Sequence, residues 1–154
     1  MTTIDMGAST VSQVMSTKLE TVNQSSTAQG AAKRMRDKRV SSLVVIDKEE
    51  TPIGIVTERD LVRQVCSKDI SSNNIIIQQI MSSHIVTIDV NASIKEAAEK
   101  MIQKKVRHLL IVDGNRLNGI ITPSDFITYL RENLNMDDVN ARILQSLKED
   151  KEGH

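Results

Sequence analysis

Threonine and aspartate recur at one fixed spacing, in a segment that could bind a ligand. The pattern Gly-Ile-Val/Ile-Thr-x-x-Asp places Thr57 and Asp60 in one copy and Thr122 and Asp125 in another. If a helix begins at the threonine, its free N–H groups and partial positive charge favour a phosphate, and the hydroxyl adds a hydrogen bond. The carboxylate one turn later has two oxygens that can accept both hydroxyls of a ribose.

The same residue types also make a helix cap without any ligand. A threonine at the N-cap position with an acidic residue three positions later is a capping-box arrangement, here with Asp in place of Glu. Pro123, directly after the second threonine, suits the first position of a helix. Both interpretations stay open, because a ligand can bind at a capped helix start.

The motif recurs because most of the chain is duplicated. Residues 14–47 align with residues 80–113 at an offset of 66, with ten identical pairs among 34 positions. A one-residue deletion then shifts the offset to 65, and the match resumes at the motif. The period exceeds the roughly 20–50 residues of a solenoid repeat. We therefore expect two copies of a small αβ unit packed as one pseudo-symmetric domain, with a ligand cleft between the related halves.

Apolar stripes at helical spacing predict one buried helix face in each copy. In the second copy the stripe comprises Ile94, Ala97, Ala98, Met101 and Ile102. In the first copy it comprises Ala28, Ala31, Ala32 and Met35. Ser93 and Glu96 form a capping box, but the first copy has Gly30 where the box needs glutamate. We expect the first turn of that helix to be weaker.

Short apolar runs predict buried strands. They occupy residues 43–46, 53–56, 109–112 and 118–121, and shorter extended pieces lie at 21–22 and 86–88. Asp113-Gly114 indicates a hairpin turn. The predicted fold class is therefore α/β (α+β): two β-α-β-β-α repeats packed with pseudo-twofold symmetry.

These elements divide the chain into five stretches. We assign residues 1–10 to an N-terminal tail, 11–66 to the first repeat, 67–75 to a linker, 76–131 to the second repeat and 132–154 to a C-terminal helical extension. The apolar segments 11–15 and 76–81 are expected to lead into their own repeats. In the extension we expect an interruption at residues 135–137, a cap at Asp137 or Asp138, and frayed residues from Glu149 to His154. The extension carries an apolar stripe, expected to pack on its own module or on a dimer mate, at Val139, Ile143, Leu144 and Leu147.

Composition argues against several classes of function. The formal net charge is zero and Phe126 and Tyr129 are the only aromatic residues, so neither nucleic acid nor an anionic membrane is an expected partner. Cys66 stands alone and His84 has no neighbours at metal-ligand spacing, so we expect no disulfide, redox role or metal site. No catalytic set or P-loop appears, no run approaches the about 20 residues of a membrane span, and the start lacks a signal sequence. We expect a cytoplasmic protein that is not an enzyme.

The ordered series of motifs, present twice, resembles the CBS domain. It runs through Val-Met-Ser, Thr-Val, Ala-Ala-x-x-Met, Leu-Val-Val-Ile-Asp and Gly-Ile-Val-Thr-x-x-Asp, and covers about residues 11–130. Two such domains in tandem resemble a CBS pair, or Bateman module. The resemblance implies a disc with two sheets packed face to face and two pseudo-symmetric clefts, each able to bind AMP, ADP, ATP or S-adenosylmethionine.

The resemblance also implies which residues line each cleft. The motif aspartate would hold the ribose hydroxyls, the threonine would approach ribose or phosphate, and the adenine would lie against the early extended segment of the opposite repeat. The first cleft would use Ile55, Thr57 and Asp60, with Ile85, Val86 and Thr87 beside the base. The second cleft would use Ile120, Thr122, Ser124 and Asp125, with Leu19, Glu20 and Thr21 beside the base.

The two clefts are expected to differ in their phosphate contacts. Arg107 and His108 precede one core strand, where the first repeat has Ser41 and Ser42. In the family this position often carries a basic residue that reaches the phosphate, and an arginine suits bidentate contact. We expect the second cleft to be the better phosphate site. Secondary candidates are Lys38, Arg39, Lys104 and Lys105, for which a role as solvated helix ends is the favoured interpretation. Glu58 and Arg59 are candidates in the first cleft.

Two functions are therefore in competition. In the first, the chain is a non-enzymatic regulatory module, in which an adenine nucleotide (AMP, ADP or ATP) or S-adenosylmethionine shifts the arrangement of two halves or subunits and an unknown protein partner responds. In the second, the motifs serve only as helix caps and the chain is a ligand-independent dimerisation or assembly module. A homodimer is expected in both.

Overall fold

The predicted order of elements is present twice. The computed structural model describes residues 9–133 and 136–152. The first repeat contains β1 (Thr21–Asn23), α1 (Ala28–Lys38), β2 (Ser42–Ile46), β3 (Pro52–Thr57) and α2 (Glu58–Gln64). The second contains β4 (Thr87–Asp89), α3 (Ile94–Lys104), β5 (Leu109–Asp113), β6 (Arg116–Ile121) and α4 (Pro123–Asn133). Short 3-10 helices lie at η1 (Val11–Gln13), η2 (Cys66–Lys68) and η3 (Ile77–Gln79), and α5 (Met136–Glu152) follows α4. The predicted fold class is confirmed.

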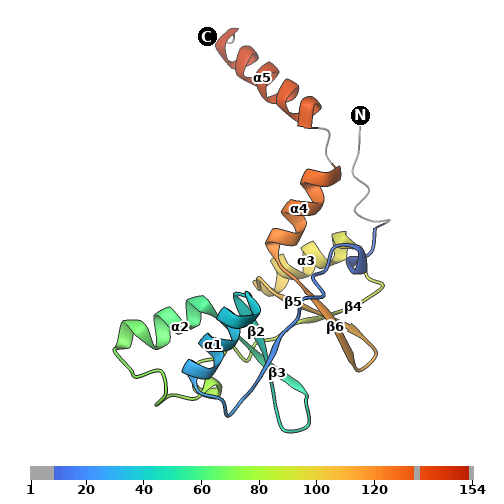
Figure 1. Ribbon diagram of the computed structural model, residues 1–154. Helices are drawn as coiled ribbons and strands as arrows, with labels where there is room; N and C mark the ends of the chain where they lie inside the picture. The colour runs from blue at the N-terminus through green and yellow to red at the C-terminus, as the bar shows by residue number, and fades with distance from the viewer. Residues whose placement is uncertain (1–8, 134–135, 153–154) are drawn as a thin grey trace.

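Two three-stranded sheets form the centre of the molecule (Figure 1). In both sheets the first strand is parallel to the second, and the third is antiparallel to the second. The sheets pack on each other through a buried cluster of Val44, Ile55, Leu110 and Ile120. Neighbouring strand residues point the other way, as Val45 does, into a cluster shared with α1. The central residues of β2 and β5 are apolar because both faces of these strands are covered.

The two lead-in segments exchange between the halves. Val11 is fully buried in the apolar cluster of the second sheet, and its N–H donates to the carbonyl oxygen of Ala92 at 2.9 Å. Ile77 is fully buried in the cluster of the first sheet, and its N–H donates to Ser26 at 2.8 Å. The expectation that each lead-in serves its own repeat was therefore wrong. Apolar side chains show that a segment is buried, but they do not say against which of two related cores.

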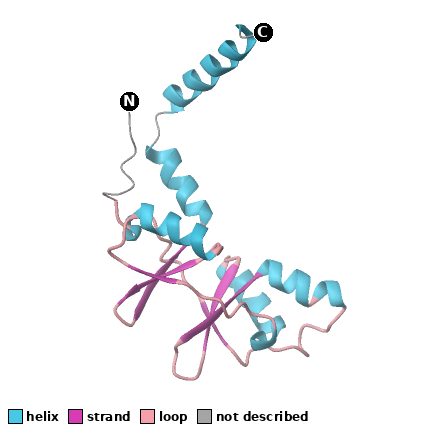
Figure 2. Ribbon diagram, turned by 180° about the vertical axis from the view of Figure 1, so that it is seen from behind, coloured by secondary structure: helices cyan, strands magenta, loops and turns pink. Residues whose placement is uncertain are grey.

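The buried faces of α1 and α3 are narrower than their apolar stripes. Ile94, Ala97 and Met101 are buried on α3, whereas Ile102 is 77% exposed and Ala98 is half-buried. On α1, Ala32 is exposed. The prediction that these stripes lie wholly inside was wrong, because each sheet covers only the residues at spacings of three and four along one side. Figure 2 shows each sheet with the helices of its own half.

The C-terminal extension forms a separate helix that projects away from both sheets (Figure 1). Helix α5 continues to Glu152. The expectation that the chain is frayed from Glu149 was therefore wrong for residues 149–152. Residues 134–135 and 153–154, and the side chains of Asp137, Asp138 and Val139, lie outside the described part. Ile143, Leu144 and Leu147 are 53%, 60% and 55% exposed. The apolar stripe therefore does not pack on its own module.

Candidate functional site

Thr57 and Asp60 form a complete capping box at the start of α2. The backbone N–H of Thr57 donates to Oδ2 of Asp60 at 2.9 Å, and the threonine hydroxyl donates to the same oxygen at 3.0 Å. The N–H of Asp60 returns a bond to Oγ1 of Thr57 at 3.2 Å. The predicted cap is thus present, and it fixes the orientation of the carboxylate through one oxygen only.

The second copy repeats this arrangement at the start of α4. The N–H of Thr122 donates to Oδ2 of Asp125 at 2.8 Å, and the hydroxyl of Thr122 does so at 3.3 Å. Here the N–H of Asp125 donates to the carbonyl of Thr122 rather than to its side chain. Among the described residues, Oδ1 of neither aspartate has a hydrogen-bond partner. Capping therefore leaves one carboxylate oxygen available in each copy.

The first cleft is a cavity of about 180 Å³ beside this cap. Its wall combines the end of β3, the lead-in of the second repeat and the segment before β5. Its lining residues are Ile55, Thr57, Asp60, Ser82, His84, Val106 and His108. The lead-in is held by a two-residue ladder, in which Ile55 and Ser82 exchange backbone hydrogen bonds of 2.9 Å in both directions. The cleft thus has an apolar wall, an acceptor at Asp60 and two imidazoles.

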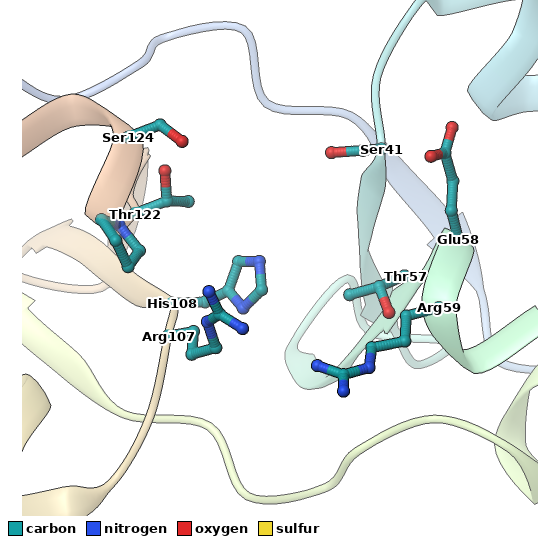
Figure 3. Close-up of a pocket in the computed structure, with 9 residues that line it drawn as sticks. Ser41, Thr57, Glu58, Arg59, Arg107, His108, Thr122 and Ser124 are labelled. Atoms are coloured by element: carbon teal, nitrogen blue, oxygen red, sulfur yellow. The ribbon is translucent and has the colours of Figure 1, made fainter. Parts of the chain in front are cut away.

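A larger central cavity of about 340 Å³ lies between the starts of α2 and α4. It shares Thr57 and His108 with the first cleft, so the two spaces meet at these residues. Its remaining lining residues are Ser41, Glu58, Arg59, Arg107, Thr122, Pro123 and Ser124. Figure 3 shows Arg107 and His108 facing Thr57 and Arg59 across this space. Its size is within the range of about 300–1,000 Å³ typical of small-molecule sites.

The charges of the central cavity favour an anion. Arg59 and Arg107 bring two permanent positive charges, against one carboxylate on Glu58. Burial lowers the pKa of His108, and Arg107 lowers it further, while Asp60 acts in the opposite direction. His108 is therefore neutral at pH 7 and can donate one hydrogen bond and accept another. The hydroxyls of Ser41 and Ser124 add further donors, whereas those of Thr57 and Thr122 already donate to the motif aspartates.

Arg107 and His108 were assigned to the second cleft, and both line the central cavity with Thr122 and Ser124 of the second motif. His108 lines the first cleft with Asp60, and Arg107 lies in the central cavity between the two motifs. His108 reaches both spaces because the two halves pack face to face, which brings the segment before β5 close to the motif of the first half. The residue before β2, Ser41, lies beside the motif of its own repeat, where its carbonyl oxygen accepts from the N–H of Glu58 at 2.9 Å.

The residues expected beside an adenine occupy different environments in the structure. Leu19 and Ile85 are half-buried and pack against the inter-sheet cluster that contains Ile120 and Ile55. Val86 is buried in the core of the second half, and its carbonyl accepts from Leu110 in the sheet. Thr21 and Thr87 begin β1 and β4, and neither lines the two cavities described above.

Glu20 is engaged elsewhere in the fold. Its Oε2 lies 2.8 Å from Nη2 of Arg34, with side-chain exposures of 22% and 41%. The secondary basic candidates are not part of the cavities either: Arg39 and Lys105 cap α1 and α3 in the left-handed conformation, and Lys38 and Lys104 lie in the last helical turns. Their roles as helix ends are sufficient to explain them.

Sequence reasoning missed Ser82, His84 and Val106 as lining residues of the first cleft. His84 is exposed to solvent and also lines the cavity. The repeat offset relates His84 and Val106 to Lys18 and Val40 in the first repeat, and this correspondence alone does not mark them as lining residues. The first cleft has imidazoles at His84 and His108. The corresponding positions in the first repeat are occupied by Lys18 and Ser42.

The two cavities bring together charged, hydroxyl and imidazole side chains. Within residues 9–133 and 136–152, no three His, Cys, Asp or Glu side chains gather so that they could hold a metal ion. Over the same residues, no helix has both the length and the apolar character needed to cross a bilayer. The site joins the carboxylate of Asp60 in the first cleft to the guanidinium groups of Arg59 and Arg107 in the central cavity.

Comparisons with known proteins agree with the duplicated architecture. The family model described as "CBS domain" matches residues 11–67 and again residues 77–132. An uncharacterized protein of Methanopyrus kandleri is 35% identical over 123 residues, which cover 79% of this chain and 63% of that protein. The CBS domain-containing protein YhcV of Bacillus subtilis is 30% identical over 117 residues, covering 76% and 82%.

Solved structures show the same fold. The crystal structure of an uncharacterized conserved protein from Pyrococcus horikoshii superposes with a TM-score of 0.75 at 30% identity, covering 86% of this chain and 98% of that one. Relatives differ in length: this chain spans 63%, 32% and 71% of three curated proteins that it matches.

Proposed function

The chain belongs to the CBS-domain family as a tandem pair, and we propose that it is a regulatory module that binds an adenosyl nucleotide in the first cleft. CBS-domain proteins are generally regulatory rather than catalytic and often bind ligands. The observation that carries the proposal is the junction of two cavities at Thr57 and His108. One cavity offers a carboxylate acceptor and an apolar wall, and the other offers positive charge.

In this proposal Asp60 binds the ribose. Its Oδ2 is already held by the N–H and hydroxyl of Thr57 at 2.9 and 3.0 Å, so the carboxylate is positioned before the ligand arrives. Oδ1 remains to accept from the ribose hydroxyls, and hydrogen bonds to a charged acceptor are worth about 1.5–3 kcal/mol each. Ile55 and Val106 offer the apolar contact for the base.

The phosphates extend from the ribose into the central cavity. Arg107 and Arg59 face one another there, and both suit bidentate contact with phosphate oxygens. An anion next to His108 favours its protonated form, so binding takes up a proton and strengthens as the pH falls towards the pKa of that imidazole. This preference favours AMP, ADP or ATP over an uncharged nucleoside.

Regulation then requires the ligand to favour one arrangement of the two halves. The central cavity is lined from both repeats, with Arg59 on α2 and Ser124 on α4. A phosphate that bonds to both brings the helix starts together, and a protein partner or a second copy can respond to this change. The change in arrangement is then transmitted to another protein.

A thermal-shift series tests the proposal. We expect one of AMP, ADP, ATP, S-adenosylmethionine or NADH to raise the melting temperature by several degrees at about 100 times its dissociation constant, with GTP as the control. In Arg107→Ala we expect the shift with that nucleotide to fall while the effect of adenosine is unchanged. If none of the adenosyl compounds shifts the transition, the capping boxes are sufficient to explain the motifs, and the assembly module becomes the better account.

A further inference from the structure

The two clefts have nearly the same lining, and the repeat shows where they differ. The offsets of 65 and 66 relate the residues that line the first cleft to positions around the second motif. The identical pairs are Ile55/Ile120, Thr57/Thr122, Asp60/Asp125, Ser82/Ser16 and Val106/Val40. The pairs that differ are His84/Lys18 and His108/Ser42. Within this lining, only these two positions distinguish the clefts.

The lead-in of the first repeat lies beside the second motif as the other lead-in lies beside the first. Ser16 and Ile120 exchange backbone hydrogen bonds of 2.9 and 3.1 Å. Lys18 follows Ser16 by two residues, as His84 follows the serine of its own lead-in. The side chain at this position therefore starts from the same wall in both clefts.

Lys18 connects this wall to the opposite one. Its Nζ donates to the carbonyl oxygen of Arg39 at 3.3 Å. Arg39 directly precedes Val40, which is the counterpart of Val106 in the lining of the first cleft. In the first cleft, the space between His84 and Val106 belongs to the cavity. In the second cleft, the four-carbon stem of Lys18 crosses the corresponding space.

The carbonyl that accepts this bond is held by the end of a helix. Arg39 caps α1 in the left-handed conformation with a φ of 55°, and the N–H of Val40 donates to the carbonyl of Met35 at 3.0 Å. Lys105 caps α3 in the same conformation with a φ of 54°. An equivalent carbonyl is therefore present beside the first cleft, where the shorter side chain of His84 lines the cavity instead.

We propose that Lys18 closes the second cleft to the nucleotide, and that the first cleft binds because His84 stands at the same position. This inference rests on the proposed function, since it concerns which cleft that nucleotide enters. An imidazole is flat and can stack on a base. The lysine ammonium has donors and no acceptor, so it offers nothing to the amino group of an adenine.

The positive charge of Lys18 does not compensate for this obstruction. In the proposed function the phosphates lie in the central cavity, and Lys18 is not one of the residues that line it. A nucleotide that enters the second cleft therefore has to displace the lysine stem and break its bond to Arg39 without a new contact to phosphate.

A rescue experiment in the Asp60→Asn background tests this inference by isothermal titration calorimetry with AMP and with ATP. That background weakens the first cleft, and we expect Lys18→His to raise the affinity at least tenfold by opening the second. Adding Asp125→Asn should remove the gain. Lys18→Arg is the matched control, because it keeps a cation that reaches the Arg39 carbonyl, and it should change affinity less than twofold. Loss of a permanent positive charge alone weakens the binding of an anion, so a gain identifies the lysine as an obstacle.

His84→Lys is the reciprocal test in the otherwise wild-type chain. The new ammonium has the carbonyl of Lys105 as its acceptor and should close the first cleft, so we expect the affinity to fall at least tenfold. His84→Ala should lower it by a smaller factor, although His84→Lys adds a charge that favours phosphate. Lys18 and His84 are both exposed, so the melting temperatures without nucleotide should stay close to that of the wild type.

The outcomes separate this inference from the proposed function. If the wild type binds through Asp60 but Lys18→His gives no gain in the Asp60→Asn background, or His84→Lys binds as tightly as the wild type, the inference is wrong and the proposed function stands. If wild-type binding depends on Asp125 as much as on Asp60, the second cleft is already open and the inference is also wrong. A wild type that binds neither nucleotide refutes both.

Discussion

Gly54→Ala tests whether the lead-in of the second repeat is bound tightly against β3. A Cβ atom at Gly54 would lie 2.7 Å from the carbonyl oxygen of Ser82 and 2.7 Å from Sδ of Met81. The methionine side chain is flexible and can move away. The carbonyl belongs to the ladder in which Ile55 and Ser82 exchange two bonds of 2.9 Å, so it can retreat only by breaking that pairing.

The cost follows from these contacts. Two backbone hydrogen bonds contribute about 1 kcal/mol each, and overpacking of a dense site costs about 1–3 kcal/mol. We expect Gly54→Ala to lower the free energy of unfolding by about 3 kcal/mol, which corresponds to roughly 6–12 °C in the melting temperature for a chain of this length. Gly119→Ala should cost a similar amount, because its Cβ would lie 2.8 Å from the carbonyl oxygen of Ser16.

Urea unfolding measures this difference, and Gly30→Ala is the matched control. Gly30 lies on α1, where the nearest atom to a new Cβ is Oγ1 of Thr27 at 3.4 Å. There the same substitution improves helix propensity and should stabilise the chain by about 0.5 kcal/mol. The slope of the unfolding free energy with urea should stay constant. If Gly54→Ala changed stability by less than about 0.5 kcal/mol, the close approach of the lead-in to β3 would be refuted.

Two further predictions concern single groups. Burial lowers the pKa of His108, so between that value and the ordinary pKa of 6.5 the unfolded chain binds more protons than the folded one, and stability falls as the pH drops through this window. His108→Gln should flatten the decline in unfolding free energy between about pH 7.5 and about pH 5.5, and an unchanged slope would exclude His108 as its source. Gly30→Glu should raise the unfolding free energy by about 1 kcal/mol, because it completes the box that Ser93 and Glu96 already form on α3. A value equal to that of Gly30→Ala would mean that the side chain does not reach the N–H of Thr27.

The repeat predicted the architecture well because its signals are local. Stripes at helical spacing and apolar runs are set by neighbours within one element, and the strands expected at 43–46 and 109–112 were found within one residue of those limits. The capping boxes at Thr57 and Ser93 were likewise predictable, since all of their partners lie within three residues.

What the sequence could not predict depends on how the halves meet. The apolar side chains of Val11 and Ile77 are suited to burial in either core. Only the packed structure shows that each residue completes the core of the other half. The same face-to-face packing turns His108 towards Asp60 rather than towards Asp125. The exposure of Ile102 was missed for a related reason: an apolar stripe predicts burial, but it does not show which of its residues the sheet covers.

The affinity of the two motif variants for AMP and ATP, measured by isothermal titration calorimetry, tests the central claim most directly. Asp60→Asn and Asp125→Asn are matched by the repeat, and each keeps an oxygen that can cap its helix. We expect Asp60→Asn to weaken binding by about 10–100-fold, the equivalent of one charged hydrogen bond, and Asp125→Asn to change it less than about twofold. Binding that is lost only in Asp125→Asn, or retained in both variants, would contradict the assignment of the nucleotide to the first cleft.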